Sequence, residues 1–237
     1  MTSFALKWIA VVTMLIDHIG VALVPRDSVW YIVCRSVGRL AFPLFAFMLA
    51  EGYFYTKNFR KYFTRLTVFA IVSEIPFDMM LHGEPVYWGS QNIFFTLLLA
   101  LGGIAVFDRL AAGGRQTLSL FSLIITAFAA EILNTDYGAF GILTVFIFYR
   151  YRGERKALAA WFTVFTLVFA ALNAFGNLPN TRSVVLSLIG GFAALSVIPM
   201  LLYNRQKGYS SKFWQYFFYA FYPVHMAVLY FMAGVMG

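Results

Sequence analysis

The segment Phe4–Val24 reads FALKWIAVVTMLIDHIGVALV, and only Lys7 and the pair Asp17 and His18 interrupt its apolar run. An α-helix of about 20 apolar residues crosses a hydrocarbon core of about 30 Å, so this segment predicts a membrane-spanning helix. A charged side chain near the bilayer centre costs about 2.5–3.5 kcal/mol on insertion scales, and such residues usually face the interior of a bundle and have a function there. The segment therefore predicts a membrane protein whose polar residues gather between helices.

The composition agrees with a membrane protein. The 237 residues are 61% hydrophobic and 12% charged, whereas soluble domains carry about 25% charged residues. The net charge of +8 fits basic cytoplasmic loops, and we expect no nucleic-acid partner. The single cysteine, Cys34, excludes an intrachain disulfide. The 19% aromatic content is typical of packing and of belts at the membrane interface.

Nine apolar stretches are candidates for crossing the membrane, and they predict an all-α, polytopic helical bundle with one domain over residues 1–237. Thirteen lysines and arginines fall in the turns near 55–65, 109–115, 150–156 and 205–212, whereas the alternate turns hold only Arg26 and Arg182. Because basic loops stay in the cytoplasm, we expect a cytoplasmic N-terminus, an outer C-terminus and a place in the bacterial inner membrane. The stretches lie at 4–24, 30–54, 61–81, 92–110, 117–133, 138–150, 157–174, 184–204 and 214–235.

Lys7 and His18 are 11 residues apart, which brings them to nearly the same helix face after about three turns and about 16 Å of rise. A cation at the cytoplasmic mouth can hold a phosphate, and an imidazole deeper in the membrane can act on a group at the end of a long arm. An acyl-coenzyme A has that shape. Histidine, with an ordinary pKa of about 6.5, suits a general base at neutral pH. The alternative is that Lys7 snorkels to the interface and His18 makes a helix-packing hydrogen bond.

Asp17 precedes His18 and projects about 100° away from it on the helix, so we do not expect it to orient His18 directly. It has two candidate partners, Arg35 and Arg39, which are four residues apart and share one face of the next helix.

Glu74 and Asp78 are also four residues apart, with Pro76 between them, and Asn92 is expected in the same outer half of the membrane. These carboxylates have two interpretations. They either form a structural network with the two arginines, or they line an acidic vestibule that attracts a cationic acceptor such as an amine.

The turn 57–65 is dense in cations, including Arg60, Lys61 and Arg65. It contributes to the positive-inside signal, and it is also a candidate for holding coenzyme A phosphates. Glu51 is a candidate partner for one of these cations. His225, near the middle of the last stretch, is ranked after His18, because a lone intramembrane histidine is more often packed than catalytic.

Several kinds of site have no counterpart in the sequence. It has no phosphate-binding glycine loop and no Gly-x-Ser-x-Gly elbow. The three histidines are scattered, so we expect no metal.

Four motifs resemble the TraX family: LKWIAVVTMLIDHIG (6–20), GRLAFPLFAF (38–47), SEIPFD (73–78) and QNIFFTL (91–97). The resemblance covers most of residues 1–100. It implies a conjugal-transfer protein associated with N-terminal acetylation of pilin. The spacing of Lys7 and His18 is also similar to the Arg/Lys-x-ten-His signature of the wider membrane acyltransferases, in which the basic residue and the histidine are essential. The SEIPFD motif is not part of that wider signature.

Together these observations predict a transferase that moves an acetyl group from cytosolic acetyl-coenzyme A to a peptide amine or an envelope acceptor, among membrane lipids. The alternatives are an O-acetyltransferase acting on an envelope glycan, a proton-coupled transporter that uses the buried carboxylates, and a non-enzymatic assembly protein. The expected roles are donor binding for Lys7, Arg35, Arg60, Lys61 and Arg65; base catalysis for His18; oxyanion stabilisation for Arg35, Arg39 or Asn92; and, for Asp17, Glu74 and Asp78, positioning of the acceptor amine or tuning of His18.

Overall fold

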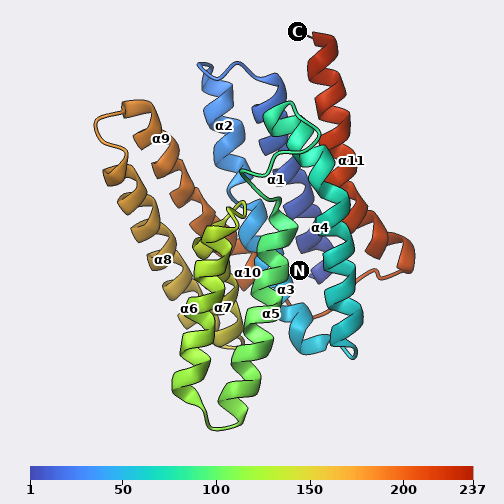
Figure 1. Cartoon of the computed structure of the whole chain (residues 1–237), viewed down its shortest axis with the longest axis vertical. Coiled ribbons are helices and arrows are strands. Elements are labelled where there is room, and N and C mark those ends of the chain that lie inside the picture. The colour runs from blue at the N-terminus through green and yellow to red at the C-terminus, as the bar shows by residue number, and fades with distance from the viewer. Residues whose placement is uncertain (237) are drawn as a thin grey trace. The chain divides into compact units, whose positions relative to one another are not determined.

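The computed structural model describes residues 1–236, and within them it has helices but no strand (Figure 1). The predicted all-α architecture is confirmed. The elements are α1 (Ser3–Leu23), α2 (Val29–Gly38), α3 (Ala41–Tyr55), α4 (Phe59–His82), α5 (Ile93–Ala112), α6 (Gln116–Ile132), α7 (Gly138–Arg150), α8 (Arg155–Gly176), α9 (Thr181–Ile189), the 3-10 helix η1 (Gly190–Ser196), α10 (Val197–Leu201) and α11 (Lys212–Met236).

Each of the nine predicted stretches coincides with helix. Two of them are interrupted: the second is α2 followed by α3, and the eighth is α9, η1 and α10 in succession. Among the described residues, six helical segments are long and apolar enough to cross a membrane. α6 and α7 are apolar but shorter, and α4 carries several charged residues. The number of spans and the cytoplasmic N-terminus stay predictions.

Side-chain caps explain where several helices begin. A side-chain oxygen just before the helix accepts a hydrogen bond from a backbone N–H of its first turn, which would otherwise lack a partner. The capping residues are Thr2 for α1, Ser28 for α2, Asn58 for α4, Asn92 for α5 and Asn180 for α9.

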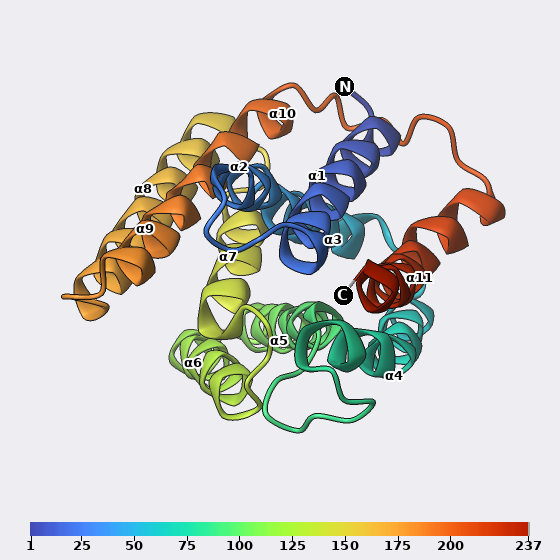
Figure 2. The same cartoon turned by 90° about the horizontal axis from the view of Figure 1, so that it is seen from above.

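The chain divides into two compact units. Unit 1 comprises residues 1–45 and the chain from Gly153 onward, and unit 2 comprises Ala46–Arg152. In unit 1, α1 packs against α2 and α11, and α8 lies beside α9 (Figure 2). In unit 2, α5 packs against α4, α6 and α7. The single domain expected over residues 1–237 stays a prediction.

One end of unit 1 joins three segments that the charge pattern assigns to the same side of the membrane. The Met1 ammonium donates to the Leu202 carbonyl at 2.6 Å. Arg155, at the start of α8, donates to the Tyr203 carbonyl at 2.9 Å. The N-terminus, the start of α8 and the loop after α10 therefore meet.

The connections assigned to the opposite side also meet each other. Arg182, at the start of α9, donates to the Arg26 carbonyl in the α1–α2 connection at 2.9 Å. In unit 2, Gln91 pairs with the loop between α6 and α7, where its N–H donates to the Asn134 carbonyl at 2.9 Å. These contacts agree with the predicted alternation of turns.

Candidate functional site

Lys7 and His18 both lie on the face of α1 that packs against α11, as their spacing predicts. The Lys7 Nζ atom is 5.5 Å from the centroid of the Phe218 ring. The His18 ring meets the Tyr222 ring edge-on, with centroids 6.1 Å apart, and it bonds to His225. The partners on α11 follow one another at helical spacing, so a single face of α11 covers both residues.

These contacts also give the direction of α11. The early residue of α1, Lys7, meets Phe218, and the late residue, His18, meets His225, so α1 and α11 run parallel. Parallel membrane helices require an odd number of crossings between them. The seven stretches predicted between α1 and α11 satisfy that requirement.

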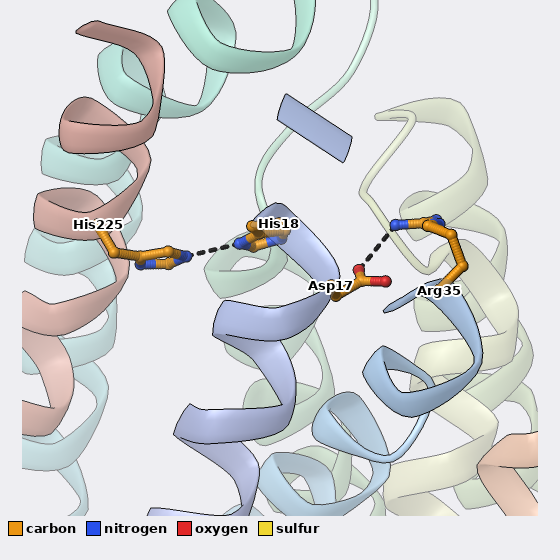
Figure 3. A network of polar contacts seen from close by, with 4 residues as sticks. All are labelled: Asp17, His18, Arg35 and His225. Carbon is orange, nitrogen blue, oxygen red and sulfur yellow. Dashed lines mark hydrogen bonds and ion pairs between the residues drawn. The ribbon is translucent and has the colours of Figure 1, made fainter. Parts of the chain in front are cut away.

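His18 and His225 form a direct hydrogen bond between their rings (Figure 3). The distance from His18 Nδ1 to His225 Nε2 is 2.6 Å, and the ring planes differ by 9°. His225 is only 6% exposed, and its Nδ1 lies 2.7 Å from the Phe221 carbonyl oxygen. His18 remains partly accessible. The pair therefore has one buried member and one that is partly exposed.

Asp17 is paired with Arg35 on the other side of α1, at 2.7 Å (Figure 3). The two side chains are 14% and 22% exposed. Arg39 is the C-cap of α2, and its N–H donates to the Arg35 carbonyl. As predicted, Asp17 takes an arginine and does not orient His18. The ion pair holds Arg35 beside Asp17, and its expected role in donor binding stays a prediction.

Glu74 and Asn92 bond to each other in unit 2. The Asn92 amide nitrogen donates to Glu74 Oε2 and, at 2.8 Å, to the Ala70 carbonyl. Its side-chain oxygen accepts from the Phe94 N–H at 2.9 Å. Both amide hydrogens and the oxygen are thus occupied, and Asn92 is 0% exposed. The amide of Asn92 therefore ties α4 to the start of α5, and its predicted oxyanion role stays a prediction.

Asp78 holds a loop in place. It is 1% exposed, and its Oδ2 accepts from the Tyr87 backbone N–H at 2.8 Å, which fixes the loop between α4 and α5. Arg35 pairs with Asp17, and Glu74 pairs with Asn92. The two interpretations of the carboxylates, a structural network with the arginines or an acidic vestibule, both stay predictions.

The cations predicted to bind the donor at 57–65 lie at the start of α4, and their role stays a prediction. Arg60 and Lys61 are exposed, and the guanidinium of Arg65 lies 5.5 Å from the centroid of the Tyr62 ring. Glu51 does not pair with this turn. Its partner is Arg152, at 2.7 Å.

A second lysine lies near the start of α1. Lys207, in the loop before α11, accepts a hydrogen bond at its carbonyl from the Phe4 N–H at 3.1 Å. Its backbone therefore lies at the N-terminal end of α1, the end that holds Lys7. From the sequence, Lys207 is only one of several cations in a basic loop, with no individual role predicted for it.

A pocket of about 300 Å³ opens in unit 2 between Phe54, Phe107, Tyr149, Arg150 and Arg152. The guanidinium of Arg152 lies 4.4 Å from the centroid of the Phe54 ring. This pocket is not lined by any of the lysines and arginines that the sequence predicts for donor binding. Within residues 1–236, no group of three or more His, Cys, Asp or Glu side chains is arranged to hold a metal ion.

The main residue that sequence reasoning undervalued is His225. Its partner His18 is 207 positions away, so no local pattern links them. The available signal was a histidine in the middle of an apolar segment, which is expensive in a membrane unless it has a partner.

Comparisons with known proteins identify the family. The family model described as "TraX protein" matches residues 3–233. The chain is 30% identical over 239 residues to the "Probable fimbrial assembly protein FimC, serogroup H1" of Dichelobacter nodosus, and the match covers 96% of this chain and 94% of that protein. No solved structure matches. The protein thus belongs to the TraX family of membrane proteins.

Proposed function

We propose that the protein is a membrane acetyltransferase that moves an acetyl group from cytosolic acetyl-coenzyme A to an amine, with His18 as the general base. The observation that carries the proposal is the common face of Lys7 and His18 against α11. About 16 Å of helix separates the two residues, from 11 positions at 1.5 Å each. The donor has a charged head and a thioester at the end of a flexible arm, and this spacing of cation and imidazole suits it.

The two ends of this face have complementary roles. Lys7 and Lys207 bind phosphates of the donor at the end where the N-terminus meets the loop before α11. His18 lies deeper and is partly accessible, so it meets the thioester.

The reaction needs one base and one stabiliser of negative charge. The amine nitrogen attacks the thioester carbonyl carbon, and His18 takes the proton that the nitrogen loses. The carbon–sulfur bond then breaks, and the departing thiolate recovers a proton from the His18 imidazolium. Arg39, the C-cap of α2, is our candidate for stabilising the oxyanion. One such donor in a dry site contributes about 3 kcal/mol.

The relative in Dichelobacter nodosus is named for fimbrial assembly, which supports a pilin-like subunit as the source of the amine. An inner-membrane location gives such an acceptor access from the outer face while the donor stays in the cytosol.

The test is acetyl transfer by purified protein in micelles, from radiolabelled acetyl-coenzyme A to a peptide with a free N-terminal amine. The N-blocked peptide is the acceptor control. His18→Asn keeps a side-chain donor toward His225 but has no base, and we expect it to lower kcat at least about a hundredfold. His82→Asn, at the exposed end of α4, is the matched control and keeps wild-type activity. Unchanged transfer by His18→Asn would remove His18 from the mechanism.

The name of the same relative refers to assembly and not to catalysis, which favours a second function, that of a non-catalytic assembly factor. A non-catalytic assembly factor would tolerate the loss of a base. If His18→Asn restores pilus or fimbrial assembly to a strain that lacks the protein, and purified wild type transfers no label, this second function holds.

A further inference from the structure

We propose that His225 is a positioning residue, which fixes His18 in the tautomer whose Nε2 carries the lone pair. The inference rests on the acetyl transfer proposed above, because it assigns the atom of His18 that acts as base. It follows from two hydrogen bonds and the donor and acceptor chemistry of imidazole.

The first bond determines the tautomer of His225. Its Nδ1 lies 2.7 Å from the Phe221 carbonyl oxygen, and a carbonyl oxygen can only accept a hydrogen bond. Nδ1 of His225 therefore carries a hydrogen. In a neutral imidazole the other nitrogen is then an acceptor, so His225 presents a lone pair at Nε2.

The second bond determines the tautomer of His18. The Nε2 atom of His225 is 2.6 Å from Nδ1 of His18, and it can only accept there. Nδ1 of His18 must donate, which leaves Nε2 of His18 without a hydrogen. The nearly coplanar rings, with planes 9° apart, direct that Nε2 away from His225 (Figure 3).

The same arrangement suits the protonated state. When His18 takes a proton at Nε2 from the acceptor amine, Nδ1 keeps its hydrogen and still donates to His225. The bond becomes charge-assisted and therefore stronger. The hydrogen at Nδ1 of His225 stays on that nitrogen, which donates it to the Phe221 carbonyl oxygen. The proton at Nε2 leaves with the thiolate, so the cycle returns both rings to their starting state.

Two substitutions with side chains of similar length test whether His18 needs the hydrogen-bond acceptor of His225 or only a side chain that fills its place. His225→Gln keeps a side-chain oxygen that can accept from His18, and His225→Met does not. The direct readout is the pair of ¹⁵N shifts of His18 in histidine-labelled protein. The chain has three histidines, so single substitutions assign the signals, and exposed His82 is the internal reference.

In the wild type we expect the neutral His18 ring to carry its hydrogen at Nδ1 and none at Nε2. His225→Gln should keep this pattern, and His225→Met should give a mixture of tautomers. In the transfer assay, His225→Met should lower kcat by about tenfold to a hundredfold, part of what a general base supplies, with KM for the donor unchanged. His225→Gln should recover most of the loss.

Three results would overturn the proposal: a hydrogen on Nε2 of neutral His18 in wild type, an unchanged His18 tautomer in His225→Met, or equal kcat for the Gln and Met variants. These failures differ from failure of the proposed function. If wild type transfers no acetyl group, the function falls whatever the tautomer. If wild type transfers and His18→Asn does not, the function stands even where His225→Met behaves as wild type.

Discussion

Asp17 and Arg35 form an ion pair at 2.7 Å on one side of α1, while the adjacent residue, His18, bonds to α11 on the other. Two successive polar residues thus join α1 to two different helices. The ion pair is mostly buried, with side chains 14% and 22% exposed. Removing one partner leaves a charge without compensation, which is costly in a low-dielectric interior.

A double-mutant cycle tests that ion pair. We expect Asp17→Asn and Arg35→Gln each to destabilise the protein, with a coupling energy of about 1–3 kcal/mol. The measurement is the free energy of unfolding in micelles for wild type, both single variants and the double variant. Additive effects would show that the two residues do not support each other.

Gly38 should not tolerate a side chain. A Cβ atom at this position would collide with the side chain of Asp17, so Gly38→Ala should lower the melting temperature and loosen α2 from α1. Gly234→Ala is the matched control, since a Cβ there meets no atom within 4 Å. In an open helical position alanine is favoured over glycine by about 0.5–1 kcal/mol. Equal melting temperatures for the two variants would contradict the close approach of α2 to α1.

Asn92 should matter for folding and not for chemistry. Asn92→Ala removes the cap of α5 and the bonds to Ala70 and Glu74. Loss of a cap alone costs about 0.5–2 kcal/mol, and Glu74, which keeps only the backbone N–H of residue 92 as a donor, adds to this. We expect a lower free energy of unfolding with kcat of the folded fraction unchanged. A normal melting curve with a large loss of kcat would instead restore the oxyanion role.

The helices were predictable because runs of about 20 apolar residues dominate local preferences. The breaks near Arg39 and at η1 were not, since they depend on how each segment packs. The shared face of Lys7 and His18 follows from the period of a single helix. The bond between His18 and His225 depends on α11 docking against α1, which no local pattern encodes.

Asn92 carries a signal that is local. An asparagine directly before an apolar run is a recognised helix-start signal, and the structure uses it in that way. The oxyanion role suggested by its expected depth in the membrane stays a prediction.

Lys7 should affect donor binding more than the chemical step. Lys7→Gln removes one of the two cations at the N-terminal end of α1, and we expect KM for acetyl-coenzyme A to rise about fivefold to tenfold, since 1.4 kcal/mol of binding energy is about tenfold. The value of kcat should change little. Lys156→Gln, an exposed cation in a connection assigned to the same side, is the control. A similar rise in KM for both variants would mean that Lys7 contributes only to a general positive potential.

The orientation of the chain can be tested by labelling single cysteines, because Cys34 is the only native one. In a Cys34→Ala background, Asp27→Cys and Gln206→Cys report on opposite ends of unit 1, and both positions are exposed. We expect an impermeant maleimide to label Asp27→Cys in intact cells and Gln206→Cys only in inverted vesicles, since basic turns stay in the cytoplasm. The reverse result would put Lys7 and Lys207 outside, where no coenzyme A is available, and the acetyl transfer proposed for His18 would lose its donor.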